Sequence, residues 1–216
     1  MARWLSRFAG HDAVDKDALL ASARFVVIDT ELTSLDKKTN RLLSVGAIGM
    51  TGNKIRVGEQ FYRVVNPGVE VPKESVLIHQ LRPEDVKRGG DLRSTLAVLR
   101  EFLGDAILVG HFAEIDRDVL RKEFVACGDK LKNAMVCTAR VQRWIVKKQP
   151  YKEDRFRELE TTDLESLGKV YQLDFHVAHH ALDDAFVTAG LWQKQMHILE
   201  GLGVTTAGGL LRIASV

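Results

Sequence analysis

The sequence contains few cysteines and no long apolar run. Cys127 and Cys137 are its only cysteines, and they lack the paired spacing of a zinc site. With no secretory segment, two thiols favour a reducing compartment and argue against a disulfide framework. No apolar run reaches the roughly 18 residues that a membrane span needs, and the opening residues lack the apolar core of a signal peptide. We therefore expect a soluble, cytoplasmic protein.

The composition is that of a globular protein. Hydrophobic residues make up 45% of the 216 residues and charged residues 28%, with a formal net charge of +2. These values exclude disordered and fibrous classes, and the length suits one domain of ordinary size. The chain shows no repeat, low-complexity tract or long linker. We expect an N-terminal extension over residues 1–23 and a single domain over residues 24–216.

The apolar pattern predicts an α/β domain. β-branched runs predict three strands that form an antiparallel meander, over residues 24–30, 41–50 and 53–65, with Gly58 at a bulge or turn. Helix and strand patterns then alternate: helices over 92–104, 113–128, 138–146, 163–171 and 181–201, strands over 106–110 and 134–138. A short helix is expected over 15–23 and a loop over 66–75. This order predicts a mixed, twisted sheet flanked by helices.

Two carboxylates stand together at the end of the first predicted strand. Asp29 and Glu31 are two residues apart, so their side chains point to the same side of the sheet. Their repulsion is unfavourable unless a cation lies between them. The alternative is the start of a solvated loop.

Two further carboxylates lie on or beside apolar helix stripes. Asp116 shares a stripe with Leu120 and Phe124, whereas Asp118 falls off it. Asp184 borders the stripe of Ala181, Ala185, Thr188 and Trp192. A carboxylate that faces the core needs a partner, and an all-oxygen set of ligands suits Mg²⁺ or Mn²⁺ better than zinc. Two such ions about 4 Å apart would clamp a phosphodiester for in-line attack.

These acids lie in segments that resemble the three motifs of the DEDD 3′–5′ exonuclease superfamily. The D-x-E motif matches Asp29-Thr30-Glu31. The G-H-N-A-x-x-D motif matches residues 110–116, and the H-x-A-L-x-D-A motif matches residues 179–185. The closest resemblance is to the DEDDh branch, which includes the proofreading epsilon subunit of bacterial DNA polymerase III. The match covers roughly residues 24 to 200, with the motifs in the family's order.

The resemblance implies a ribonuclease H-like fold and a nuclease that uses two Mg²⁺ or Mn²⁺ ions at a single-stranded 3′ end. Asp29 would bridge both ions. Glu31 and Asp184 would complete the site of the ion that carries the attacking water, and Asp116 would support the ion at the leaving oxygen. His179 would be the general base: it falls in the family's register, and a loop position ahead of the helix lets it reach the site of Asp184. His180 and Asp183 would then face elsewhere.

The resemblance also indicates substrate contacts, with some departures. They are expected from Thr30, Leu32, Thr33, His79 and Phe112. Leu32 would wedge against the terminal base, the alternative being a core leucine, and the alternative for His79 is a satisfied surface histidine. Phe112 replaces the usual Asn and could stack on a base. The usual Gly after the first motif is absent, and His111 is expected to be structural.

The basic segment 140–157 allows two interpretations. It interleaves aromatic residues with seven basic ones and fits either a strip that tracks phosphates or a solvated helix face. We expect a single-stranded nucleic acid 3′ end as the partner, with DNA favoured over RNA, and a polymerase partner is left open. The alternatives are RNA trimming, towards which the D-x-E-L-T stretch leans, and a non-catalytic nucleic-acid-binding module.

Overall fold

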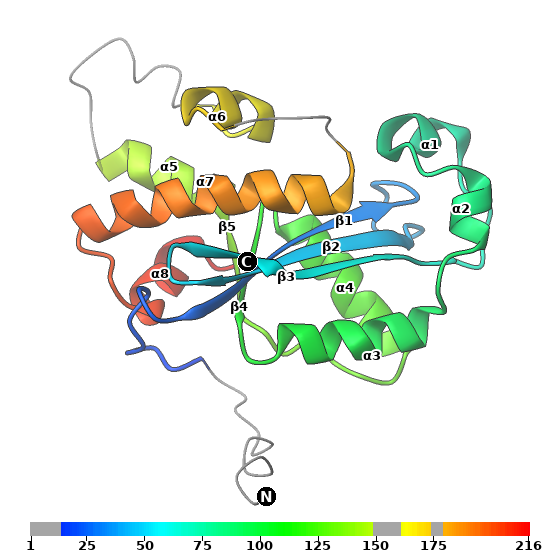
Figure 1. The fold of residues 1–216 in the computed structure, drawn as a ribbon, viewed down its shortest axis with the longest axis horizontal. Coiled ribbons are helices and arrows are strands. Elements are labelled where there is room, and N and C mark those ends of the chain that lie inside the picture. The colour runs from blue at the N-terminus through cyan, green and yellow to red at the C-terminus, as the bar shows by residue number, and fades with distance from the viewer. Residues whose placement is uncertain (1–13, 149–160, 174–178) are drawn as a thin grey trace, which may run out of the picture.

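The computed structural model describes residues 14–148, 161–173 and 179–216. Within them the chain forms one five-stranded sheet in the order β3-β2-β1-β4-β5 (Figure 1). The strands are β1 (Arg24–Leu32), β2 (Leu42–Thr51), β3 (Lys54–Val64), β4 (Ile107–Gly110) and β5 (Met135–Cys137). The first three pair antiparallel, whereas β1, β4 and β5 are parallel. The mixed sheet expected from the sequence is confirmed.

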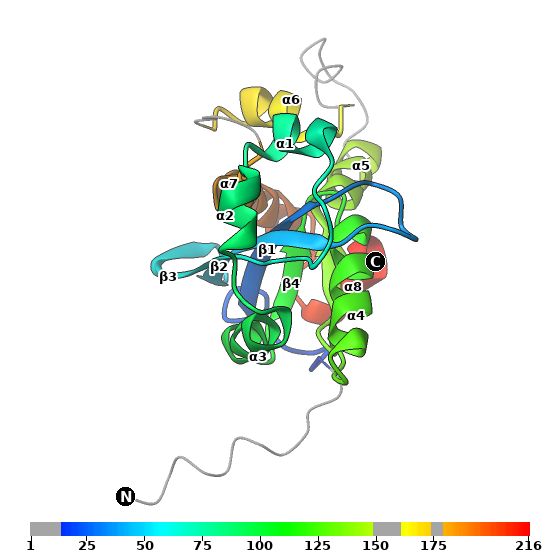
Figure 2. The same ribbon diagram turned by 90° about the vertical axis from the view of Figure 1, so that its right-hand side faces the viewer.

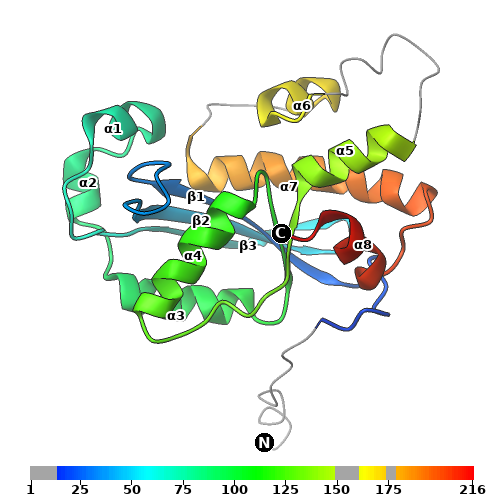
Figure 3. The ribbon, with the colours of Figure 1, turned by 180° about the vertical axis from the view of Figure 1, so that it is seen from behind.

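Helices cover both faces of this sheet, as the views in Figures 2 and 3 show. Helices α3 (Leu92–Leu103) and α4 (Glu114–Ala126) pack on one face. Helices α5 (Thr138–Lys148), α7 (Ala181–Gly201) and α8 (Ala207–Ala214) pack on the other. Three shorter helices complete the described fold: α1 (Lys73–His79), α2 (Pro83–Lys87) and α6 (Leu164–Val170). None of the helices in the described part of the chain is long and apolar enough to cross a membrane.

The pleat of β1 decides which way its polar end points. Phe25 and Val27 pack in the cluster beneath α5, α7 and α8, whereas Val26 and Ile28 pack in the cluster beneath α3 and α4. Successive side chains alternate between the faces. Asp29 and Glu31 therefore face α7, and Thr30 faces α4.

Some predicted elements were wrong. The described part of the N-terminal extension, residues 14–23, contains turns and a bridge between Leu19 and Thr206 instead of a helix. It packs on the domain, with the Leu20 side chain buried. The predicted loop over 66–75 gives way to α1 from Lys73, and α2 and α8 were not predicted. These helices span 5 to 8 residues, too short for a clear periodic signal.

The expected irregularity at Gly58 is confirmed. Ile48 of β2 pairs with Gln60, but Met50 pairs with Ile55. The intervening residues of β3, Gly58 among them, therefore bulge out of register.

Candidate active site

The candidate site lies at the carboxyl end of β1, next to its parallel neighbour β4. Within the sheet, β1 lies between β2, to which the chain continues, and β4, which is added later on the opposite edge of β1. Such a switch point, at the carboxyl ends of parallel strands, is where open α/β sheets bind ligands. Residues 29–31 lie in the last part of β1, which ends at Leu32, and residues 111–116 follow β4 directly.

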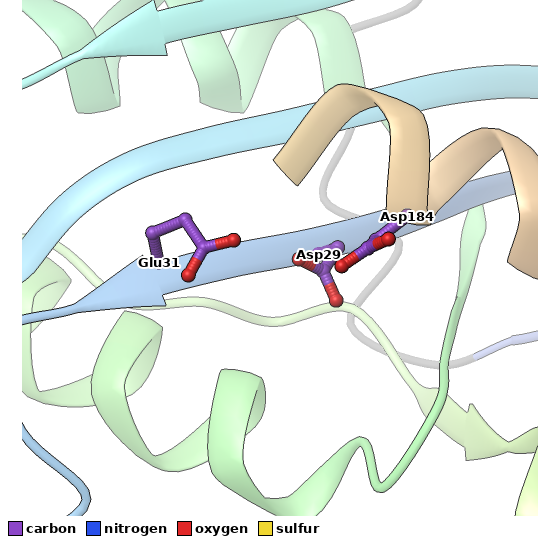
Figure 4. A group of neighbouring side chains, drawn as sticks. All are labelled: Asp29, Glu31 and Asp184. Carbon is purple, nitrogen blue, oxygen red and sulfur yellow. The ribbon is translucent and has the colours of Figure 1, made fainter. Parts of the chain in front are cut away.

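Three carboxylates meet at this point. One ligand oxygen each from Asp29, Glu31 and Asp184 lies within 4.8 Å of the others, and Figure 4 shows the α7 residue beside the two from β1. The structure thus brings together three of the four acids that the sequence predicted for one cation site. They form the only group of three or more residues of metal-binding types that the described part of the chain brings so close.

A glycine lets α7 come close enough to the sheet for this meeting. Gly46 of β2 pairs with Asp29, and the first turn of α7 rests directly on it. A Cβ at Gly46 would lie 2.3 Å from the backbone carbon of Ala181 and 2.3 Å from the backbone nitrogen of Leu182. No side chain fits there. The sequence motifs did not single out Gly46, because its role depends on a helix far along the chain.

Asp116 stands beside the trio, on α4. Its side chain is 4% exposed, and the Thr30 hydroxyl donates a 2.6 Å hydrogen bond to it. The stripe predicted for this helix is confirmed, since Leu120 and Phe124 are buried as well. Thr30, expected to contact substrate, therefore uses its hydroxyl to hold a carboxylate. Asp118 faces away and pairs with Lys37 at 2.7 Å.

Burial raises the pKa values of all four carboxyls, and repulsion from the other site carboxylates raises those of Asp29 and Glu31 further. Burial is the largest cause for each. The pKa of Asp29 is raised well above its usual value, with the charges of Asp116, Glu31 and Asp184 adding to the effect of burial. The pKa of Glu31 rises to about 8, and that of Asp116 to about 7 although its bond from Thr30 lowers it. A divalent cation would remove this repulsion, so the residues fit one.

His179 lies in the loop just before α7, as predicted, and is followed by the N-cap residue His180. Its backbone N–H donates a 2.9 Å hydrogen bond to the Asp184 carboxylate. Its φ is 74°, in the left-handed region that non-glycine residues rarely adopt. The exposed His179 therefore stands next to the carboxylates in a conformation that its surroundings impose.

His180 lies in different surroundings. Its ring packs against Tyr62 of β3, with the ring centroids 4.6 Å apart. Its Nδ1 lies 3.2 Å from a carboxylate oxygen of Asp183. The expectation that His180 and Asp183 face away from the carboxylates agrees with these contacts.

Leu32 and Thr33, expected at the terminal base, are engaged within the protein. Leu32 is 9% exposed and packs in the cluster beneath α3 and α4. The Thr33 hydroxyl accepts a 2.9 Å hydrogen bond from the Arg41 N–H. These contacts hold the loop between β1 and β2 at the edge of the site.

His79 and Phe112 each present a group that could contact a ligand, an unpaired ring nitrogen in His79 and an exposed ring in Phe112. His79 is 3% exposed, and its Nδ1 accepts a 3.0 Å hydrogen bond from the Leu81 N–H. The proton therefore resides on Nε2, which is buried without a hydrogen-bond partner in the described structure. Burial lowers the pKa of His79, so its ring is neutral near pH 7. Phe112 is 39% exposed and adopts a φ of 52°.

The contacts of His111 agree with the structural role expected for it. Its Nδ1 lies 2.8 Å from the Thr138 hydroxyl at the start of α5. Burial is the main cause that lowers its pKa to about 4.

Only the first part of the basic segment falls within the described residues. Arg140 pairs with Glu114 at 2.6 Å, and the Lys148 ammonium lies 5.7 Å from the Trp144 ring centroid. Arg143 and Lys147 also lie within the described part. The remaining basic and aromatic residues of the segment, Tyr151, Lys152, Arg155, Phe156 and Arg157, lie outside it.

Known proteins show the same organisation. A family model described as "Exonuclease" matches residues 26–192. The chain is 28% identical over 184 residues to DNA polymerase III subunit epsilon of Aquifex aeolicus, covering 85% of this chain and 84% of that protein. It is 26% identical over 190 residues to the PolC-type DNA polymerase III of Thermotoga maritima, covering 88% of this chain but only 13% of that protein.

Solved structures share the fold. E. coli exonuclease I in complex with a dT13 oligonucleotide gives a TM-score of 0.71 at 17% identity, over 84% of this chain and 43% of that one. Exonuclease X in complex with 5′ overhanging duplex DNA gives a TM-score of 0.63 at 20% identity, over 86% of this chain and 97% of that one. The expected ribonuclease H-like fold is confirmed.

Proposed function

We propose that this chain, which belongs to the exonuclease family, removes nucleotides one at a time from the 3′ end of single-stranded DNA. The observation that carries the proposal is the meeting of Asp29, Glu31 and Asp184 within 4.8 Å, with a histidine bound through its backbone to the last of them. The products would be nucleoside 5′-monophosphates. This proposal goes beyond family membership, which fixes only the class of exonuclease.

The four acids would hold two divalent cations, Mg²⁺ or Mn²⁺. We assign Asp29, Glu31 and Asp184 as direct ligands, and Asp116 as a ligand that acts directly or through water. Bound there, the cations would neutralise the carboxylates and stabilise the charge that develops on the phosphate in the transition state. Oxygen ligands and the raised pKa values of the carboxyls both suit hard cations.

His179 would act as the general base. The attacking water loses a proton as its oxygen bonds to phosphorus, and the bond to the leaving 3′ oxygen breaks. Two observations support this role for His179: its backbone N–H bonds to Asp184, and its exposure leaves the imidazole free to pass the proton to solvent. An imidazole suits this role because it titrates near neutrality.

The protein groups left free around the acids would bind the terminal nucleotide. The Nε2–H of His79 is a buried donor without a described partner, and it would be satisfied by an oxygen of the nucleotide. The exposed Phe112 ring offers a flat face to a base. Leu32 and Thr33 would shape the nucleotide site by holding the loop between β1 and β2. Thr30 would do so by holding the Asp116 carboxylate.

The substrate is assigned to DNA because the matched relatives include polymerase III proteins. The deciding experiment compares matched single-stranded DNA and RNA oligonucleotides labelled at the 5′ end, with Mg²⁺ and then Mn²⁺. A ladder that shortens from the 3′ end, faster on DNA, is the expected result. If RNA is shortened faster than DNA, RNA is the preferred substrate. If neither oligonucleotide is shortened, the proposal is refuted. Copurification with a polymerase would test whether this chain, like the named epsilon subunit, has such a partner.

A further inference from the structure

Tyr62, His180 and Asp183 form a cluster that the proposed reaction does not use. The planes of the Tyr62 and His180 rings meet at 34°, with centroids 4.6 Å apart. The side chain of His180 is 38% exposed and that of Asp183 is 58% exposed. The cluster is thus ordered by contacts within the protein, yet open to a ligand.

The sheet register fixes where this cluster lies relative to the carboxylates. Asp29 pairs with Gly46, and Gly46 pairs with Tyr62, so the three residues form one row across the sheet. Tyr62 is two strands from Asp29, a spacing of about 10 Å. The first turn of α7 crosses the row on Gly46, so that Asp184 meets Asp29 and His180 meets Tyr62.

The sheet ends at this cluster. In the order β3-β2-β1-β4-β5, β3 is an edge strand, and Figure 2 shows it projecting from the body of the molecule. A single-stranded nucleic acid whose 3′ end lies at the carboxylates can therefore leave the site across Tyr62 without meeting another β-strand of the sheet.

The charges nearby select which part of a nucleotide this cluster can receive. Burial raises the pKa of Tyr62, and the negative charges of Glu31, Asp183 and Asp85 raise it further. Of these groups, the exposed Asp183 carboxylate lies beside the His180 ring, and its charge repels a phosphate. A nucleobase is neutral and flat, and aromatic side chains bind bases by stacking without regard to sequence.

We propose that the stacked rings of Tyr62 and His180 form a platform for a nucleobase upstream of the terminal nucleotide. The contact with Tyr62 packs one face of the imidazole, so the ring is oriented before the nucleic acid binds. The platform rests on the proposed exonuclease function, since it requires the 3′ end to lie at the carboxylates. It would add affinity for the strand without taking part in bond breakage.

The test is a scan with abasic oligonucleotides. Single-stranded DNA carries one abasic residue at each of the first four positions from the 3′ end in turn, and kcat and KM are measured separately. We expect the wild type to show a KM raised about fivefold or more at one upstream position, the usual worth of one stacked base. In Tyr62→Ala and His180→Ala the intact strand should already show that raised KM, and the abasic residue at that position should raise it no further.

Conservative variants separate the platform from a purely structural role. Tyr62→Phe and His180→Phe keep a flat ring, so both should retain most of the wild-type KM. His197→Ala alters an exposed histidine farther along α7 and should change nothing. Melting temperatures report whether each variant folds.

Two outcomes would overturn the platform. One is an equal abasic penalty in the wild type and the Ala variants at every position. The other is a KM that rises when an uncharged methylphosphonate linkage is introduced but not when the base is removed, which would indicate a phosphate contact. Failure of the exonuclease proposal itself looks different: the wild type would not shorten the intact strand at all.

Discussion

His179 and His180 are adjacent in the chain but have different partners, and this difference assigns the base. His179 is tied to Asp184 through its backbone, whereas the His180 ring lies on Tyr62. We expect His179→Ala to lower kcat by about two to four orders of magnitude, the usual effect of losing a positioned base. Single-turnover rates at saturating enzyme between about pH 6 and 9 measure it.

His180→Ala is the matched comparison for that variant. Its rate at saturation should fall by less than about tenfold, because the ring has no place in the proton transfer. A larger loss at His180 than at His179 would refute the assignment of the base.

The acids make a second residue-scale prediction. Asp29→Ala should abolish turnover, because it removes the carboxylate at the centre of the trio. In the absence of metal the variant should melt at the same temperature as the wild type or higher, since the mutation relieves like-charge repulsion. Asp118→Ala, which changes a carboxylate that faces Lys37, should keep most activity. Turnover assays and thermal melts in chelator check both variants. A fully active Asp29→Ala would show that the trio is not the reaction centre.

At the scale of elements, the contact between β2 and α7 holds the site together. Gly46→Ala would place a methyl group 2.3 Å from the backbone of Ala181 and Leu182. Helix α7 must then lift and carry Asp184 and His179 away from Asp29. A displacement of about 1 Å can cost roughly 10²-fold in rate, so we expect at least that loss together with a lower melting temperature.

Gly58→Ala is the control for that prediction. A Cβ at Gly58 meets nothing within 4 Å, and the residue lies in the bulge of the neighbouring strand. Its activity should match the wild type. If Gly46→Ala were as active as Gly58→Ala, the close approach of α7 would not be needed for catalysis.

The helices and strands also show how much of the structure could be predicted from the sequence. The long helices and the meander were predictable, because their apolar residues repeat with clear periods. The meeting of Asp29 with Asp184 was foreseen from motif order, while Gly46 was not, because only the fold shows what rests on it. Leu32 illustrates the reverse limit: its motif position indicated a substrate contact, but its side chain packs largely in the core. Tyr62 carries no sequence signal, since its importance arises from a ring 118 positions away that α7 delivers.

At the scale of the whole molecule, the buried acids couple stability to metal and to pH. Glu31 has a folded-state pKa of about 8 against an ordinary value of 4.5. Between these values the folded protein retains a proton that the unfolded chain has lost, so the free energy of unfolding falls as the pH rises. This contribution is favourable to the unfolded state above about pH 8 and absent below pH 4.5. Asp29, Asp116 and Asp184 act in the same direction.

We therefore expect chelator to lower the melting temperature, and to lower it more at pH 8 than at pH 5.5. Mg²⁺ or Mn²⁺ should restore it in proportion to ligand binding, and exonuclease activity should require the same ions. Other titrating groups also change with pH, so the informative quantity is the difference between the wild type and Glu31→Gln, which lacks the ionising carboxyl. In chelator, Glu31→Gln should gain stability over the wild type as the pH rises from 5.5 to 8, and it should gain less from added metal. A constant difference across that range, or full hydrolysis of a 3′-ended oligonucleotide in excess chelator, would contradict a metal site built on these carboxylates.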